Sequence, residues 1–186
     1  MHMDATRKRW RVDDVRALPE DGNRYEVIRG VLLVTPAPRP VHQSAVLQLV
    51  MTLEPYTELT RIGRLFVSPA EVIVDDETMV QPDLFVVPGR GRVPSSWRMT
   101  PKPLLAIEVI SPSSARYDRV DKRRLYSDER VAEYWIVDTD SRVFERWRPG
   151  DERPEILDAR MTWQPDPAHD ALAIDLVAYF ARVWGE

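Results

Sequence analysis

The chain contains no cysteine, no long apolar run and no excess of positive charge. Without cysteine, disulfide bonds, thiolate metal sites and cysteine nucleophiles are excluded, and a cytoplasmic location is compatible with this composition. No segment approaches the roughly 20 apolar residues that a membrane-spanning helix needs. The N-terminal stretch MHMDATRKRW lacks the apolar core of a signal peptide. We therefore expect a cytoplasmic protein with no membrane segment.

The charges nearly balance, with 26 Lys and Arg against 30 Asp and Glu and a formal net charge of −4. Such a chain is not a polycation that coats nucleic acid, so any surface for nucleic acid must be a local patch. The length of 186 residues predicts one domain over residues 1–186. Residues 1–10 are given no structural weight, as a disordered or expression-derived segment.

Strand-like and helix-like segments follow one another along the chain. Residues 25–34 predict a hairpin that turns near residues 29–30, and apolar residues at helical spacing predict a helix over residues 42–56. Further strands are expected at residues 64–67, 71–74, 84–87, 104–110, 133–139 and 142–147, and further helices at residues 13–18, 116–128 and from 175. This pattern favours an α/β or α+β domain.

The segment LLAIEVI, residues 104–110, places a carboxylate where the pattern predicts a buried strand. Apolar residues surround Glu108 on both faces of that strand, as in the centre of a sheet. A buried carboxylate costs several kcal/mol unless it is paired or binds a metal ion. Glu108 is therefore a candidate either for a metal ligand or for a buried ion pair.

Two further residues extend this candidate site. Asp83 follows a proline at the start of the apolar strand in QPDLFVV, and Lys122 lies on the helix predicted after Glu108. Two carboxylates at adjacent strand ends can share one Mg²⁺, which polarises a phosphoryl oxygen and activates bound water. A nearby lysine can orient that water or offset the charge that develops on a phosphate. Asp83, Glu108 and Lys122 thus suggest phosphodiester hydrolysis.

Each of these residues also has a structural interpretation. Asp83 after a proline can cap a turn, and Glu108 can form a purely structural ion pair with Lys122 or an arginine. Asp118 precedes Lys122 by four residues, a spacing typical of an ordinary helical ion pair. The same spacing places Asp118, Lys122 and Tyr126 on one helix face, which can support Glu108. The residues alone leave these alternatives open.

A series of motifs resembles the Uma family of proposed restriction endonucleases, within the PD-(D/E)XK nuclease superfamily. The motifs are, in order, YEVIRG, TPAPRPVHQ, QPDLFVV, LLAIEVISPSS followed by D, K and Y, and VAEYWIVD. The resemblance implies a restriction-endonuclease-like fold, with a mixed central sheet flanked by helices and Mg²⁺, or Mn²⁺ in its place, at the active site. Asp83 and Glu108 match the acidic residues that hold the metal. The superfamily usually carries its lysine at the position of Ile110, so Lys122 is inferred to supply the ammonium.

The same resemblance implies a further acidic ligand from an early element, for which Glu71 is slightly favoured over Glu26. Gln43, at the start of a helix, is a supporting candidate, whereas its neighbour His42 is expected to be an ordinary helix-start residue. The candidates for contacts to nucleic acid are Arg90 and Arg92 in the loop at residues 88–103, and Arg119 and Arg123 on the helix that carries Lys122. Their alternative is a solvated face balanced by acidic neighbours.

Two classes of function follow. The first is a Mg²⁺-dependent endonuclease that hydrolyses DNA, acting as a homodimer because two-strand cutting usually needs two active sites. The second is a catalytically silent relative that keeps the fold to bind nucleic acid or a protein. Neutralising Asp83 or Glu108 should abolish metal binding in the first class and change nothing in the second.

Overall fold

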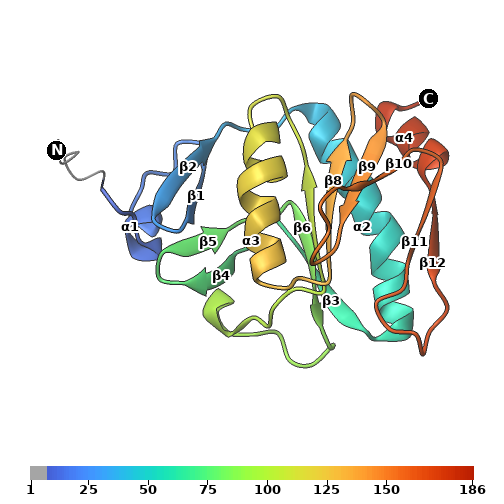
Figure 1. Ribbon diagram of the computed structural model, residues 1–186, viewed down its shortest axis with the longest axis horizontal. Coiled ribbons are helices and arrows are strands. Elements are labelled where there is room, and N and C mark those ends of the chain that lie inside the picture. The colour runs from blue at the N-terminus through green and yellow to red at the C-terminus, as the bar shows by residue number, and fades with distance from the viewer. Residues whose placement is uncertain (1–7) are drawn as a thin grey trace.

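The structure is a computed structural model that describes residues 8–186 (Figure 1). Its centre is a six-stranded sheet in the order β10-β9-β8-β7-β6-β3. The strands are β3 (Gly63–Val67), β6 (Leu84–Pro88), β7 (Leu105–Val109), β8 (Glu133–Asp138), β9 (Val143–Trp147) and β10 (Glu155–Leu157). Strands β7 and β8 run parallel, and the other neighbours in this sheet run antiparallel. The expected mixed central sheet is confirmed.

A second sheet has four strands in the order β2-β1-β5-β4. These strands are β1 (Arg24–Ile28), β2 (Val31–Thr35), β4 (Val72–Asp75) and β5 (Thr78–Val80). The β1–β2 hairpin turns at Arg29 and Gly30 as predicted, with φ of 52° and 80°. Two successive residues at positive φ match the twist of a tight hairpin, and the glycine adopts this conformation at no steric cost. Strand β5 was not predicted, and its pairing with β4 keeps β4 in this second sheet.

Helices cover both faces of the central sheet, as Figure 1 shows. Helices α2 (Pro40–Thr60) and α4 (Leu176–Trp184) pack on one face, and α4 contacts the two-stranded ribbon of β11 (Arg160–Trp163) and β12 (Leu172–Asp175). The other face is covered by a π-helical segment, η2 (Tyr117–Lys122), that continues into α3 (Arg123–Asp128). A short helix, α1 (Val12–Arg16), packs beside β1, and a 3₁₀ turn, η1 (Trp97–Met99), lies in the loop before β7.

The two faces of β7 differ in chemistry. Leu105, Ile107 and Val109 point into the apolar core formed with α2 and α4. Successive side chains of a strand alternate between faces, so Ala106 and Glu108 point the opposite way, beneath η2 and α3. Glu108 therefore lies on the face of the central sheet that η2 and α3 cover, where the four-stranded sheet also packs.

The N-terminal segment joins this fold from Lys8 onward. Trp10 donates its backbone N–H to the carbonyl oxygen of Gly30 at 2.9 Å and packs against Val12 and Val15 of α1. Residues 8–10 thus have a defined place that the sequence analysis did not give them, whereas residues 1–7 lie outside the described part of the chain. Within residues 8–186, no helix combines the length and the apolar character needed to cross a bilayer.

Candidate active site

The sheet register brings Asp83 beside Glu108. Asp83 immediately precedes β6, whose first residue, Leu84, is paired with Ile107 of the antiparallel strand β7. Continuing that register by one residue places Asp83 opposite Glu108, and residues directly opposite each other share one face of a sheet. The two carboxylates that the sequence analysis assigned to adjacent strand ends are therefore neighbours.

Lys122 reaches the same place from the helix above. Its Nζ lies 2.8 Å from Glu108 Oε1, 3.0 Å from Glu26 Oε2 and 3.4 Å from Asp118 Oδ1. All four side chains are at most 3% exposed, so this lysine is not a solvated helix residue. It ends a π-helical segment, a rare conformation that occurs often at functional sites.

The position that carries the lysine in most of the superfamily is apolar here. Ile110 is buried among Ala106, Leu125 and other apolar side chains of the α3 face. An ammonium at that position would have to enter this apolar cluster, at a high desolvation cost. The ammonium beside Glu108 instead comes from Lys122, as the departure from the superfamily pattern suggested.

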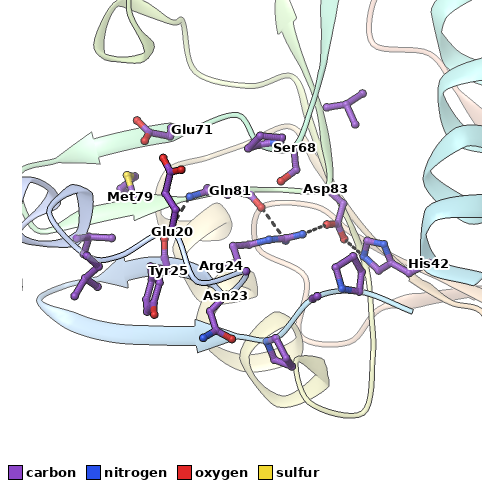
Figure 2. Close-up of a pocket in the computed structure, with 18 of the residues that line it drawn as sticks. Glu20, Asn23, Arg24, Tyr25, His42, Ser68, Glu71, Met79, Gln81 and Asp83 are labelled. Atoms are coloured by element: carbon purple, nitrogen blue, oxygen red, sulfur yellow. Dashed lines mark hydrogen bonds and ion pairs between the residues drawn. The ribbon is translucent and has the colours of Figure 1, made fainter. Parts of the chain in front are cut away.

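Asp83 is held by three donors, of which Arg24 and His42 are drawn in Figure 2. Arg24 Nη2 donates to Oδ1 at 2.7 Å, while the backbone N–H of Val109 and His42 Nε2 lie 2.8 Å and 2.9 Å from Oδ2. Burial by itself would raise the pKa of Asp83. The hydrogen bond to His42, the charge of Arg24 and the Val109 N–H outweigh it and lower that pKa to about 2.

The other carboxylates are less well satisfied. Burial raises the pKa of Glu108 well above its usual range, and the nearby charges of Asp118, Asp83 and Glu26 oppose the effect of Lys122. Burial likewise raises the pKa of Asp118, whose Oδ1 is buried without a hydrogen-bond partner. Burial alone would lower the pKa of Lys122. The charges of Glu108, Glu26 and Asp118 together have the larger effect and raise that pKa well above its usual range, so Lys122 stays protonated.

The charge balance of this cluster fits a divalent cation. Four buried carboxylates, Glu26, Asp83, Glu108 and Asp118, face two permanent cations, Arg24 and Lys122. Two negative charges are in surplus when all four carboxylates are ionised and His42 is neutral. Hard cations such as Mg²⁺ prefer this oxygen-donor set. Within residues 8–186, however, no three acidic or histidine side chains are already arranged as metal ligands. Asp83 and Glu108 would hold the ion, once the contact of Arg24 with Asp83 opens.

Two adjoining cavities give access to this cluster. The smaller, of about 240 Å³, is lined by Asp83, Glu108, Asp118 and Lys122, together with Arg24, His42 and the loop at residues 111–114. The larger, of about 510 Å³, lies against Arg24, His42 and Asp83 from the side of β1 and β5. Substrate atoms can therefore approach both carboxylates, although the protein buries them.

Comparisons with known proteins give the family and the fold of this chain. A family model named Uma2 and described as "Putative restriction endonuclease" matches residues 12–177. This chain belongs to the Uma2 family. A crystal structure described as "a putative nuclease belonging to DUF820 from Anabaena variabilis ATCC 29413" aligns with a TM-score of 0.72 and 19% identity. The alignment covers 94% of this chain and 99% of that chain, and at this identity it shows a shared fold. No match was found among curated proteins.

The structure of this Uma2 protein changes the choice of the additional acidic residue. Glu71, the favoured candidate, makes an ion pair with Arg16 at the far side of the larger cavity from Asp83 (Figure 2). Glu71 lies away from the cluster because it precedes β4, and β5 separates β4 from β1, the strand that carries Glu26. Glu26 lies in the cluster instead, accepting the Gln81 backbone N–H at 2.6 Å through Oε1.

The supporting candidates lie around the cluster in different ways. Gln43 is exposed and lines the larger cavity. Tyr126 follows Lys122 by four residues and is buried, with its ring centroid 4.7 Å from that of Tyr134. Burial, followed by the charge of Glu108, raises the pKa of Tyr126 well above its usual range, so its hydroxyl remains protonated.

Sequence reasoning missed two residues of this Uma2 site. His42 was expected to be an ordinary helix-start residue, yet it is buried and bonded to Asp83 from the first turn of α2. Its place in the motif TPAPRPVHQ was the available signal. Arg24 opens β1 directly before the motif YEVIRG, and no spacing or periodicity distinguishes it from the chain's other arginines.

The arginines proposed for nucleic-acid contact have mostly found partners within the protein. Arg90 pairs with Glu54 and Glu58. Arg119 Nε lies 2.7 Å from Glu145 Oε1, and its Nη2 lies 3.1 Å from Asp138 Oδ2. Arg123 stacks on Trp147, 4.8 Å from the ring centroid, whereas Arg92 is exposed. Asp118, the acidic residue that directly precedes Arg119, is itself buried. Contact with a phosphate backbone would thus cost Arg90 and Arg119 existing ion pairs.

Proposed function

We propose that this Uma2 protein is a Mg²⁺-dependent endonuclease that hydrolyses phosphodiester bonds of DNA, with Mn²⁺ able to replace Mg²⁺. One observation carries the proposal. Asp83, Glu108 and Lys122, from two strands and a helix, meet in a buried cluster whose surplus negative charge suits a divalent cation. Ionised carboxylates in excess of their cations make a buried cluster costly, and a bound cation would offset that cost.

The residues divide the chemistry between them. Asp83 and Glu108 supply carboxylate oxygens to the cation, which when bound polarises a phosphoryl oxygen and lowers the pKa of bound water. Lys122 is surrounded by Glu26, Glu108 and Asp118, which keep it protonated. It therefore acts as a hydrogen-bond donor that orients water or offsets charge on the phosphate, and not as a general base.

A second copy of the chain would provide the second active site needed to cut both strands of a duplex. We therefore propose a homodimer on DNA. Sedimentation velocity with and without a short duplex measures this directly, and a complex containing one copy of the protein would contradict it. The cleavage of one strand does not depend on the outcome.

The decisive experiment is calorimetric titration of Mn²⁺ into the wild type and into Asp83→Asn, each with and without a short DNA duplex. We expect wild type with duplex to bind Mn²⁺ and Asp83→Asn to bind none, because the substitution removes one of the two carboxylate ligands. Glu71→Gln is the matched control: it neutralises a carboxylate in the adjoining cavity but outside the cluster, and should bind as wild type does.

Cleavage provides the second readout. Supercoiled plasmid incubated with Mg²⁺ should be nicked by the wild type and by Glu71→Gln, and should remain intact with Asp83→Asn, with Lys122→Met or with EDTA. Circular dichroism of each variant establishes that it is folded. A folded wild type that binds no Mn²⁺ under either condition would refute the proposed metal chemistry.

A silent, binding-only relative is favoured by one observation: Arg24, His42 and Val109 already occupy both oxygens of Asp83. In that case DNA or a protein partner would bind wild type and Asp83→Asn equally, and Mn²⁺ would not change the affinity. The same hydrogen bonds are also compatible with an active site, in which the contact of Arg24 with Asp83 opens when substrate and cation bind.

A further inference from the structure

The Arg24 guanidinium lies between the two carboxylates assigned to the cation. Its Nη2 is 2.7 Å from Asp83 Oδ1, and its Nη1 is 4.0 Å from Glu108 Oε2. Nη1 also donates to the backbone carbonyl of Gln81 at 3.1 Å (Figure 2). The side chain is 20% exposed, against 2% for each carboxylate, so it is the more accessible member of this contact.

A divalent cation and this guanidinium need the same oxygens. Mg²⁺ binds carboxylate oxygens at about 2.0–2.1 Å, whereas Asp83 Oδ1 now accepts a hydrogen bond from Arg24 and Oδ2 has two donors of its own. Two cations held side by side in a buried site also repel each other strongly, because water does not screen them there. Cation binding in the present arrangement therefore requires Arg24 to move.

Arg24 has a place to which it can move. It lines both the smaller cavity, which contains Glu108 and Lys122, and the larger one on the other side of Asp83. A guanidinium that leaves a carboxylate needs another anion, and the planar fork of arginine binds a phosphate through two parallel hydrogen bonds. A backbone phosphate of the substrate is the anion that the proposed reaction brings to this site.

We propose that Arg24 is a positioning residue that competes with the divalent cation for Asp83 and Glu108, and that a substrate phosphate releases it. Cation binding is then weak in the free protein and tightens when nucleic acid is bound. The inference rests on the proposed function, and it adds that the order of binding is built into the site: substrate first or together with the cation. Arg24 acts through Asp83 and Glu108 and is not assigned a role in the chemical step.

The test is Mn²⁺ binding by Arg24→Gln without DNA, followed by the electron paramagnetic resonance signal of free Mn²⁺. We expect Arg24→Gln to bind Mn²⁺ about tenfold tighter than the wild type, or more, because the competing ion pair is gone. Arg39→Gln is the matched control. Arg39 lines the same smaller cavity but pairs with Asp140 at 3.1 Å on the exposed rim, so its loss removes equal charge without freeing Asp83.

A second measurement can be made without Arg24→Gln. Wild type should bind Mn²⁺ more tightly with a short duplex than without it, after subtraction of the Mn²⁺ bound in the matching sample of duplex with Asp83→Asn. For Arg24→Gln the difference between the two conditions should be smaller. This comparison remains informative if Arg24→Gln does not fold.

The outcomes separate this inference from the proposed function. One outcome is that Arg24→Gln binds Mn²⁺ no tighter than the wild type, and that adding Asp83→Asn to either protein abolishes the binding. The cation site is then supported and the competition by Arg24 is refuted. Equal affinity of the wild type with and without duplex refutes it as well. If neither protein binds Mn²⁺ in any condition although both are folded, the proposed function fails together with the inference.

Discussion

The buried side chains on the two faces of β7 are stabilised by different interactions. One face places Ile107 and Val109 against α2 and α4, where apolar contact alone stabilises the fold. The other places Glu108 under Lys122, where ion pairs must offset the loss of hydration. Both faces are equally hidden from water, since Ile107 is 0% and Glu108 is 2% exposed.

The difference shows where the protein gives up stability. Burying Ile107 is favourable by about 1.5–3 kcal/mol relative to exposure. A buried ion pair yields little net stability, yet removing one partner leaves an uncompensated charge at a cost of several kcal/mol. The ionic face is therefore costly to keep and costly to alter, which is expected of a site retained for binding or catalysis.

The largest effect should come from removing the ammonium group of Lys122. Lys122→Met should destabilise the protein by about 3–5 kcal/mol at pH 8, because Glu26, Glu108 and Asp118 lose the ammonium that they share. The loss should be smaller at pH 5, where the carboxylates can take up protons. Urea unfolding at the two pH values measures both quantities.

The control for this prediction is Lys102→Met, which removes an exposed lysine that lies 3.4 Å from Glu129. Exposed ion pairs contribute about 0–1 kcal/mol, so this variant should unfold nearly as the wild type does. If Lys122→Met were as stable as Lys102→Met, the ionic face would not differ from an ordinary surface.

The next effect is a pH dependence of opposite sign to that of a typical acid. Because the folded-state pKa of Glu108 is raised, its contribution to stability is present below its unfolded-state pKa and is lost as the pH rises toward the folded-state value. Wild type without metal should lose about 1.4 kcal/mol for each pH unit over which the folded state alone keeps that proton. Glu108→Gln should lack this decline.

Free energies of unfolding of wild type and Glu108→Gln, measured in EDTA from pH 5 to pH 8, provide the comparison. The advantage of Glu108→Gln over the wild type should grow with pH. A constant difference between the two proteins would mean that Lys122 fully compensates Glu108 and that no charge surplus remains there.

The smallest effect should arise on the apolar face. Ile107→Val removes one buried methylene group and should cost about 0.5–1.5 kcal/mol. Since no charge is involved, the cost should be the same at pH 5 and pH 8 and unchanged by Mn²⁺. A clear dependence on pH or Mn²⁺ would show that the two faces of β7 are coupled through the strand.

Much of this arrangement was predictable from the residues. A glutamate within LLAIEVI stands out because the residues on both faces of the strand are apolar. The β1–β2 hairpin was predicted from the turn at Arg29 and Gly30. The pairing of Asp83 with Glu108 was expected from their places at strand ends. The inference that Lys122 supplies the superfamily's ammonium came from the family resemblance, because a lysine on a charged helix is usually solvated and has no pattern of its own.

Other features depended on contacts between distant segments. Glu71 and Glu26 are both acidic residues in predicted strands, with a slight preference for Glu71. The unpredicted strand β5 separates them, because it lies between β1, which carries Glu26, and β4, which Glu71 precedes. Arg24 and His42 reach Asp83 from β1 and α2, so no local pattern could have assigned them. The ion pairs of Arg90 and Arg119 could not be predicted either, because their partners lie on the distant elements α2 and β9.

Local composition and alternation thus suffice to identify a mixed α/β domain, an apolar strand with one buried carboxylate, and the absence of thiol chemistry, because these depend on neighbouring residues only. The fold alone determines which charges share a buried space. Ion pairing depends on distance in three dimensions, and the assembly of Arg24, Asp83, Glu108 and Lys122 exists only once two sheets and a π-helical turn have come together.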